Sequence, residues 1–365
     1  MKKRKIATTI ALLFMMIFLI FACKKKNDKT MDILQIDSTP YEIEYGDLPQ
    51  PNIPGDNKLS NSGVQLGRML FYEKMLSKDN SISCGSCHNQ KTAFSDTNRL
   101  SKGVGGSFGK RHAMAVFNML WNSNKFFWDG RAHLLRDQSL MPIHDNLEMG
   151  ETLDNVVNKL RKSSQYSSQF IKAFGSSEIT SEKISLALEQ FMNSIISFNS
   201  KYDDYLAGKA ILNAVEERGR FLFFTEYNPS FPEASGADCQ HCHGGANFEN
   251  DKYMNNGIDG NLTLNDVGRE AVTNNPNDKG KFKVTSLRNI ALTPPYMHDG
   301  RFKTLEQVVN HYNLVKNSNY LDPSFQQQLP NGLLLSNDDK AALVAFLKTL
   351  TDTKLTNDSK FSSPF

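Results

Sequence analysis

Residues 84–88 read Cys84-Gly85-Ser86-Cys87-His88, and residues 239–243 repeat the pattern as Cys239-Gln240-His241-Cys242-His243. CxxCH is the attachment signature of c-type haem. Two thiols one helical turn apart can add to the two vinyl groups of one porphyrin, and the histidine that follows then lies beneath the iron as its proximal ligand. The sequence therefore predicts two covalently bound haem c groups, one held by Cys84, Cys87 and His88 and the other by Cys239, Cys242 and His243.

The spacing of the cysteines argues against two other uses of CxxC pairs. A structural zinc site would place its two pairs about 15–20 residues apart, whereas Cys87 and Cys239 lie in different parts of the chain. A thioredoxin-type redox pair needs one motif in a βαβ context, which this sequence lacks. The fifth cysteine, Cys23, lies outside both motifs, and five cysteines among 365 residues do not form a disulfide framework.

Similar stretches flank the two motifs. Leu66–Phe71 (LGRMLF) precedes the first motif as Arg218–Phe223 (RGRFLF) precedes the second. Downstream, Trp128–Arg131 (WDGR) corresponds to His298–Arg301 (HDGR). We therefore expect an internal duplication, with an N-terminal haem domain over residues 59–205 and a C-terminal haem domain over residues 206–365.

Apolar residues elsewhere recur at helical spacing. Amphipathic helices are predicted over residues 151–160 and 181–198, and after Ser336, whose side chain is expected to cap a helix that runs toward Leu350. No run of alternating strand residues stands out. Loops at residues 103–109 and 250–281, rich in Gly, Asn and Asp, are expected to carry haem or partner contacts. The predicted fold class is all-α, with two cytochrome c-like domains.

Residues 1–23 contain the three parts of an export signal: a basic start, an apolar run, and the small residue Ala22 before Cys23. The pattern resembles a bacterial lipoprotein signal, in which that cysteine is lipidated and becomes the mature N-terminus. A cleaved signal without lipid and an uncleaved anchor are the alternatives. All three place the folded part outside the cytoplasm. We predict a periplasmic, membrane-anchored lipoprotein in which the polar, proline-containing residues 24–58 form a tether.

The composition excludes several function classes. The formal net charge is +3, from 42 Lys and Arg against 39 Asp and Glu, and seven of the basic residues flank the N-terminal apolar segment. The remaining chain is therefore near neutral, which gives no support for nucleic-acid binding. With 39% hydrophobic and 22% charged residues, the chain is expected to be a folded globule, neither disordered nor a polytopic membrane protein.

From about Leu59 to Thr351, the chain resembles a bacterial di-haem cytochrome c peroxidase. The resemblance is carried by an ordered set of stretches around the two CxxCH motifs: Leu66-Gly67-Arg68, Phe127-Trp128-Asp129-Gly130-Arg131-Ala132, Pro295-Tyr296-Met297-His298-Asp299-Gly300 and Thr304-Leu305-Glu306. It implies that the haem ligated by His88 reacts with hydrogen peroxide. The haem ligated by His243 would receive electrons from a small cytochrome c or cupredoxin. Proteins of this family are often homodimers.

The same resemblance assigns roles to three further residues. Glu148 matches the distal acid/base and Gln138 its hydrogen-bonding neighbour, at the family's spacing of twenty and ten residues from Trp128. A carboxylate near an apolar haem face is a suitable proton shuttle, because desolvation brings its pKa toward the working pH. Trp128 matches a tryptophan between the haems that bridges an electron path. Without the motif, Glu148 would be interpreted as a solvated residue before a helix starting near Thr152, and Trp128 as core.

Two departures concern the N-terminal haem and a calcium ion. Residues 89–111 contain no histidine, although typical members place one there that blocks the peroxidatic iron until the other haem is reduced. His112 instead stands where the family has an asparagine that helps to bind calcium between the domains. Imidazole is a poor calcium ligand, which weakens a calcium site whose other ligands would be the backbone carbonyls of Thr293 and Pro295.

A third departure concerns the C-terminal haem. Tyr312 occupies the position at which typical members have a methionine as sixth iron ligand, and here the chain resembles MauG, a di-haem enzyme that oxidises tryptophans of a partner protein. Phenolate ligation would lower the haem potential, because the anionic oxygen stabilises ferric iron. His311 and Met297 are competing candidates for this ligand.

Three functions follow from these patterns. The leading prediction is an exported di-haem peroxidase that reduces hydrogen peroxide to water with electrons from a small redox protein. The alternative is a MauG-like enzyme that uses peroxide to oxidise a protein or an organic substrate, favoured by Tyr312 and by the missing distal histidine. A purely electron-transferring di-haem cytochrome is the third, and it would have no need for a distal carboxylate at Glu148.

Overall fold

The computed structural model describes residues 35–365, and residues 36–365 form one compact unit. The predicted signal over residues 1–23 and the predicted lipidation of Cys23 lie outside the described residues. Within the described part of the chain, no helix is both long and apolar enough to cross a membrane.

The described chain is rich in helix. The α-helices are α2 (Asn61–Tyr72), α3 (Cys84–Cys87), α4 (Leu135–His144), α5 (Leu153–Arg161), α6 (Ser164–Phe174), α7 (Ser181–Ser194), α8 (Lys201–Leu206), α9 (Ala214–Phe224), α10 (Glu270–Thr273), α11 (Leu305–Asn313) and α12 (Asn337–Thr349). Strands β1 (Tyr253–Met254) and β2 (Phe282–Lys283) form an antiparallel pair. A helix-rich chain with so little sheet agrees with the predicted class.

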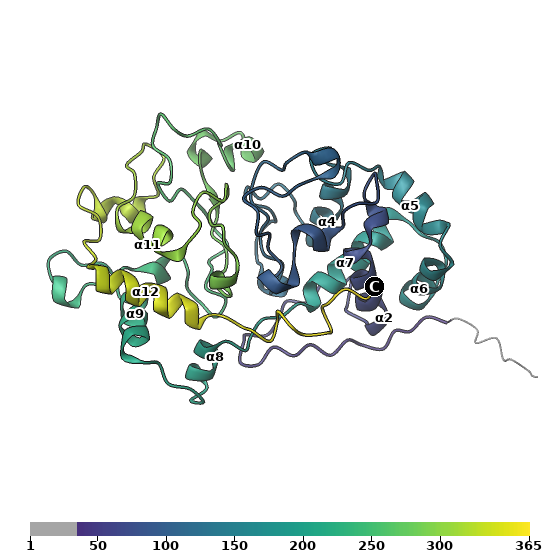
Figure 1. Ribbon diagram of the computed structural model, residues 1–365, viewed down its shortest axis with the longest axis horizontal. Helices are drawn as coiled ribbons and strands as arrows, with labels where there is room; N and C mark the ends of the chain where they lie inside the picture. The colour runs from purple at the N-terminus through teal and green to yellow at the C-terminus, as the bar shows by residue number, and fades with distance from the viewer. Residues whose placement is uncertain (1–34) are drawn as a thin grey trace, which may run out of the picture. The chain divides into compact units, whose positions relative to one another are not determined.

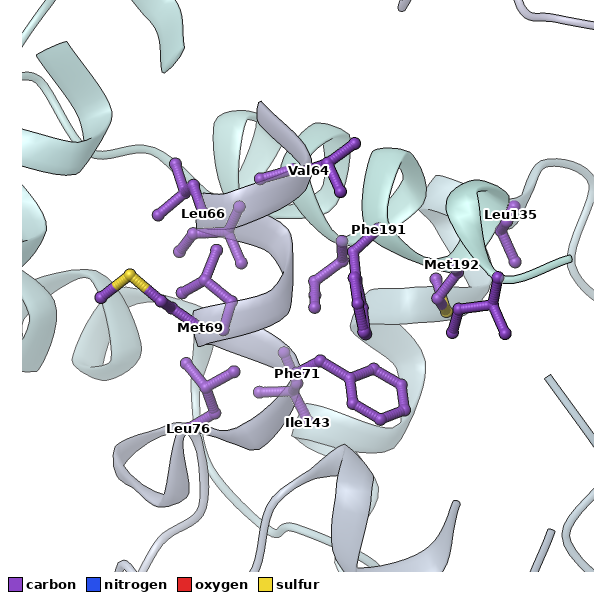
Figure 2. Packing of buried hydrophobic residues seen from close by; sticks show 14 of the residues in the cluster. Val64, Leu66, Met69, Phe71, Leu76, Leu135, Ile143, Phe191 and Met192 are labelled. Carbon is purple, nitrogen blue, oxygen red and sulfur yellow. The ribbon is translucent and has the colours of Figure 1, made fainter. Parts of the chain in front are cut away.

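The N-terminal half is built on the packing of α2 against α7, with α4, α5 and α6 around them (Figure 1). Figure 2 shows the apolar side chains that fill the space between these helices, among them Val64, Leu66, Met69, Phe71, Leu135, Ile143, Phe191 and Met192. These residues recur at helical spacing, so one face of each helix is apolar. Their burial is the main source of stability in this half.

The C-terminal half repeats this arrangement with α9 against α12, joined by α11 (Figure 1). Its core contains the aromatic side chains of Tyr202, Phe223, Phe248 and Phe346, whose rings meet mostly edge to face. In residues 35–365, each half therefore has one large apolar core, and two smaller clusters lie beside them, one around Leu120 and one around Phe325. A common origin of the halves and the exact domain limits remain predictions.

Three predicted helices are found with adjusted ends. α5 begins after its cap Thr152, and Ser336 caps α12 by accepting a hydrogen bond from the Asp339 amide. The helix predicted over residues 181–198 ends earlier, at Ser194. Beyond it, the Ser197 amide donates to the side chain of Asn118. The apolar spacing of the sequence continues past Ser194 because these residues are also buried. Their backbone amides, however, donate to side-chain oxygens in place of the carbonyl oxygens of a helix.

Both ends of the described chain pack on the N-terminal half. Residues 36–58, predicted as a tether, run along it: Tyr41 donates its amide to the Leu59 carbonyl, and Leu48 is buried. At the other end, Phe361 enters the N-terminal core and its carbonyl accepts a hydrogen bond of 2.7 Å from the Tyr72 hydroxyl. The chain after α12 therefore returns to the half in which the fold begins.

One close helix contact occurs in both halves, and it gives a stability prediction. A Cβ atom on Gly67 of α2 would lie 1.9 Å from the Ala187 carbonyl oxygen, and one on Gly219 of α9 would lie 1.9 Å from that of Ala342. We expect Gly67→Ala and Gly219→Ala each to lower the free energy of unfolding by about 1–3 kcal/mol, the usual cost of overpacking. Urea unfolding of the haem-loaded protein, followed by circular dichroism, measures this.

Gly55→Ala is the matched control, because a Cβ atom there would meet nothing within 4 Å. Its unfolding midpoint should stay close to that of the wild type. Alanine has the higher helix propensity by about 1 kcal/mol. A midpoint that rises in Gly67→Ala would therefore show that the two helices can move apart without cost, contrary to the expectation.

Candidate active site

One continuous cavity of about 1340 Å³ is lined by residues of both CxxCH motifs. Burial raises the pKa of Cys84 and Cys239 to about 12 and that of Cys87 and Cys242 to about 11, so the free thiols are neutral. They face a largely apolar space bordered by side chains such as Phe71, Phe117, Val309 and Leu343. Paired thiols at the edge of an apolar cavity suit a porphyrin attached by thioether bonds, so the residues present fit the predicted haem groups.

The two motif histidines are held in the same way. His88 Nδ1 lies 3.1 Å from the Phe94 carbonyl oxygen, and His243 Nδ1 lies 3.2 Å from that of Phe248. A proton on Nδ1 that is shared with a carbonyl leaves the Nε2 lone pair for a metal. Burial lowers the pKa of both histidines, that of His243 to about 4, which keeps the imidazoles neutral as metal ligation requires.

The loop after α4 carries the predicted distal group. Gln138 lies on α4, Glu148 follows the helix, and both line the cavity together with His88. Asp145 organises a tight turn, in which its carbonyl accepts hydrogen bonds from the amides of Glu148 and Gly150. The structure thus brings Gln138 and Glu148 to the cavity that His88 faces.

The environment of Glu148 changes its acidity. Burial, and then repulsion from Asp145, raise the pKa of Glu148 above its usual value, and Arg131 offsets part of this effect. When the pKa of a carboxyl group is raised, the pH range in which both its protonated and its ionised forms are populated moves toward neutral. It can therefore accept and return a proton within one reaction.

Trp128 is fixed from both halves of the molecule. Its indole nitrogen donates a 2.8 Å hydrogen bond to the His112 carbonyl, and its own carbonyl accepts one of 2.8 Å from the Lys283 amide. Trp128 lines the cavity that contains both motifs. The role as an electron bridge between the haems, which the resemblance implies, stays a prediction.

His112 has no free ring nitrogen. Its Nε2 lies 3.2 Å from the Ser95 hydroxyl and its Nδ1 lies 3.2 Å from the Asn98 carbonyl oxygen. The imidazole is therefore held by the fold. Across residues 35–365, no group of three or more His, Cys, Asp or Glu side chains is arranged to hold a metal ion. The calcium site at Thr293 and Pro295 remains a prediction.

Tyr312 and Met297 both line the cavity, and one side chain contacts both. Asn256 Nδ2 donates a 3.1 Å hydrogen bond to the Tyr312 hydroxyl and lies 3.5 Å from Met297 Sδ. Burial raises the pKa of Tyr312 to about 12, an effect that the Asn256 hydrogen bond partly offsets. The phenolic proton will leave at neutral pH only if a positive charge such as ferric iron compensates for it.

His311 is placed differently from its neighbour. Its Nε2 lies 3.1 Å from the Asn256 carbonyl oxygen, and His311 is not among the residues that line the cavity. The structure therefore favours Tyr312 and Met297 over His311 as sixth ligand. Sequence reasoning missed Asn256, although it lies in the Asn- and Gly-rich segment 250–281 that was expected to carry haem contacts.

An ion-pair network joins the two halves beside Trp128. Arg111 donates to Asp129 at 2.6 Å and to both carboxylate oxygens of Asp266, at 2.7 and 2.8 Å. Burial disfavours the charge on Arg111, but the two carboxylates raise its pKa and keep it protonated. Asp129 belongs to the WDGR stretch, so the network fixes the backbone next to the tryptophan. Nothing in the sequence pairs Arg111 with residues in the distant loop.

The chain is similar to known proteins over most of its length. A family model described as di-haem cytochrome c peroxidase matches residues 61–211. The cytochrome c551 peroxidase of Nitrosomonas europaea is 35% identical over 315 residues, which covers 83% of this chain and 86% of that protein. The methylamine utilization protein MauG of Methylorubrum extorquens is 31% identical over 337 residues, which covers 91% of this chain and 90% of that protein.

A solved structure agrees with these sequence matches. The crystal structure of a MauG-like protein associated with microbial copper homeostasis has a TM-score of 0.77 at 33% identity, and the match covers 89% of this chain and 99% of that one. Family membership implies two haem c groups, which the paired cysteines and oriented histidines of the cavity can hold. The chain belongs to the di-haem cytochrome c peroxidase family and is an oxidoreductase of the peroxidase class.

Proposed function

We propose that the protein reduces hydrogen peroxide to water, with electrons from a small cytochrome c or cupredoxin. The observation that carries this proposal is that Glu148 and Gln138 line the same cavity as His88, on a chain whose residues 89–111 include no histidine. A haem iron bound through His88 would supply the redox centre at which peroxide reacts. A cytochrome that only transfers electrons has no use for a proton shuttle at this place.

The proposed chemistry uses the chain's own groups for proton transfer. Reduction of one hydrogen peroxide to two waters consumes two electrons and two protons. Glu148 takes the proton from one peroxide oxygen and gives it to the other, which then leaves as water. Gln138 orients the peroxide by hydrogen bonding. Trp128, held by hydrogen bonds from both halves, bridges the path by which electrons arrive from the C-terminal haem.

The test is a rapid-mixing experiment on the oxidised protein. We expect the fully oxidised soluble part of the chain, starting after Cys23, to change its absorbance at once when it is mixed with hydrogen peroxide in the absence of reductant. The reason is that residues 89–111 contain no histidine that could block the peroxidatic iron. Stopped-flow absorbance measures the reaction, and a two-haem c-type spectrum before mixing is the control.

Two other outcomes are informative. A reaction that begins only after one electron has been added would show that another residue blocks the iron and that the enzyme is gated. No reaction with peroxide in either state would refute the proposal. Turnover is then measured as peroxide-dependent oxidation of a reduced small cytochrome c.

A MauG-like oxidation of a protein or organic substrate is the second candidate function. It is favoured by Tyr312, which lines the cavity and whose hydroxyl accepts a hydrogen bond from Asn256. Tyrosine ligation would give this haem a low potential. A haem of low potential is hard to reduce and easier to oxidise. It is therefore better suited to storing oxidising equivalents than to accepting electrons from a donor protein. Consumption of peroxide without any donor protein, coupled to oxidation of an added substrate, distinguishes this function from the first.

The export signal supports a location for either activity. A basic start, an apolar run and Ala22-Cys23 suit a lipoprotein of the periplasm, anchored by a lipid on Cys23. Small donor proteins of the cytochrome c or cupredoxin type would reach the enzyme in that compartment.

A further inference from the structure

A second glutamate, Glu249, lines the haem cavity and has no part in the chemistry described above. It follows Phe248, whose carbonyl oxygen holds the imidazole of His243. One of its carboxylate oxygens accepts a hydrogen bond from the side-chain amide of Asn247. Glu249 therefore stands on the loop that positions the proximal ligand of the C-terminal haem, whereas Glu148 belongs to the cavity wall of the N-terminal haem.

The position of Glu249 is fixed from the N-terminal half. Asn118 is 1% exposed, and its Nδ2 donates a 2.8 Å hydrogen bond to Asn247 Oδ1. Asn118 is itself fixed, because its Oδ1 accepts a 2.7 Å hydrogen bond from the Ser197 amide. This contact sets the orientation of the Asn247 amide, so that its NH₂ group faces Glu249. Asn247 is thus a positioning residue that holds one carboxylate oxygen in place.

Lys283, whose charge partly offsets the raised pKa of Glu249, forms its ion pair with a different carboxylate. Lys283 of β2 lies 3.0 Å from Asp251 Oδ1, and its ammonium also donates to the Lys125 carbonyl and to Asn122. In residues 35–365, no Lys or Arg lies within ion-pair distance of Glu249. Burial, and then repulsion from Asp251, raise the pKa of Glu249 to about 7, with Asn247 and Lys283 offsetting part of the effect.

We propose that Glu249 is the group that takes up a proton when an electron enters the haem bound through His243. One electron from the donor protein would reduce a haem iron held by His243, and the Glu249 carboxylate would take up one proton from solvent at the same time, so that the added negative charge is balanced. The net charge of the cavity stays the same. The step rests on the proposed function only for the source of the electron.

The physical reason is the cost of adding charge to a cavity of low dielectric constant. An electron that arrives without a compensating charge interacts unfavourably with nearby anions such as Asp251 and Glu249 itself. A proton on Glu249 removes one of these repulsions. Asp251 is less suited to the role, because its carboxylate is paired with Lys283 and accepts hydrogen bonds from the Ser123 amide and hydroxyl.

The test is a redox titration of the low-spin haem at a series of pH values from about 5 to 9, a range that brackets the raised pKa. The protein carries both haems, and chemical mediators supply the electrons, so neither peroxide nor a donor protein is needed. Reduction raises the pKa of Glu249 further. We therefore expect the midpoint potential of the wild type to fall as pH rises from neutral, and expect Glu249→Gln to lose this slope.

Three variants keep the experiment decisive. Glu148→Gln should retain the slope, because its carboxylate lies near the other haem. Asp251→Asn should move the sloping region to lower pH, since it removes the charge that raises the pKa of Glu249. Asn247→Ala should move the region to higher pH, since it removes a hydrogen bond to the carboxylate. These two shifts test the role even if Glu249→Gln fails to bind both haems.

A slope in Glu249→Gln equal to that of the wild type would overturn the proposal, as would a wild-type potential that does not vary with pH. Peroxide reactivity is measured separately by rapid mixing. An enzyme that reacts with peroxide but shows no slope refutes the role of Glu249 alone. A protein with the slope but no peroxide reaction refutes the proposed function and leaves the proton uptake established.

Discussion

Glu148→Gln is expected to slow the reaction with hydrogen peroxide by roughly 10²- to 10⁴-fold, the usual contribution of a positioned acid/base group. Glutamine has the same shape and can still accept a hydrogen bond, but it cannot take a proton from peroxide and return it. Stopped-flow absorbance of the oxidised protein at several peroxide concentrations measures the second-order rate constant.

The pH dependence of the same reaction gives a second signature. The shuttle must begin as a carboxylate, so the wild-type rate should fall as pH drops through the pKa of Glu148. Burial and Asp145 raise this pKa, and the fall should therefore begin at a higher pH than for a solvated glutamate. In Glu148→Gln this acid limb should be absent. Rates measured between about pH 4 and 8 test the assignment, because this window covers ordinary and raised carboxyl pKa values.

Glu182→Gln on α7 is the matched control, because it makes the same chemical change at an exposed position. It should react with peroxide at the wild-type rate. If Glu148→Gln also reacts at that rate, Glu148 has no role in the mechanism, and a cytochrome that only transfers electrons becomes the better description of this chain.

Tyr312→Met is expected to raise the potential of the C-terminal haem, within the range of about 0.8 V that axial ligands span. A phenolate stabilises ferric iron through its negative charge, whereas a neutral thioether favours the ferrous state. The substitution should also replace the optical and EPR signature of the low-spin haem by that of a His/Met site. Spectroelectrochemistry and EPR of the oxidised protein measure both effects.

Two further variants separate the two cavity residues that could ligate this iron. Tyr312→Phe removes the hydroxyl and supplies no sulfur, and Met297→Leu removes the neighbouring thioether. If Tyr312 is the ligand, Tyr312→Phe changes the spectrum and Met297→Leu does not. The opposite pattern would assign the iron to Met297, which Asn256 also contacts. That result would remove the specific support for a MauG-like function.

The two haem attachment sites could be predicted from the sequence because their chemistry is local. Two thiols and an imidazole must lie within five consecutive residues to reach one porphyrin, so each CxxCH motif is complete as read. Amphipathic helices could be predicted for a similar reason, since the spacing of apolar residues is set by the helix itself. The helix after Ser336 begins where its predicted capping residue indicates, and α5 begins close to its predicted start near Thr152.

Several features depend on residues that only the folded chain brings together. The helix predicted to continue to residue 198 ends at Ser194, because Asn118 and Asp352, far away in the sequence, supply acceptors for the backbone amides that follow. An imidazole such as that of His112 can ligate a metal, but both of its ring nitrogens lie within hydrogen-bond distance of other groups, the Ser95 hydroxyl and the Asn98 carbonyl oxygen. Periodicity and motif spacing carry no information about such partners.

The sequence by itself predicted two haem attachment sites, the candidate acid/base and bridging groups, and a helix-rich chain. The tertiary structure alone decided which side chains contact one another. Asn256 contacts both Tyr312 and Met297. Asn118 donates a hydrogen bond to Asn247, which in turn donates one to Glu249. Covalent haem attachment and helix formation depend on residues that lie close together in the sequence. The pKa of a cavity carboxylate depends instead on burial and on charges that arrive from distant segments, which only packing specifies.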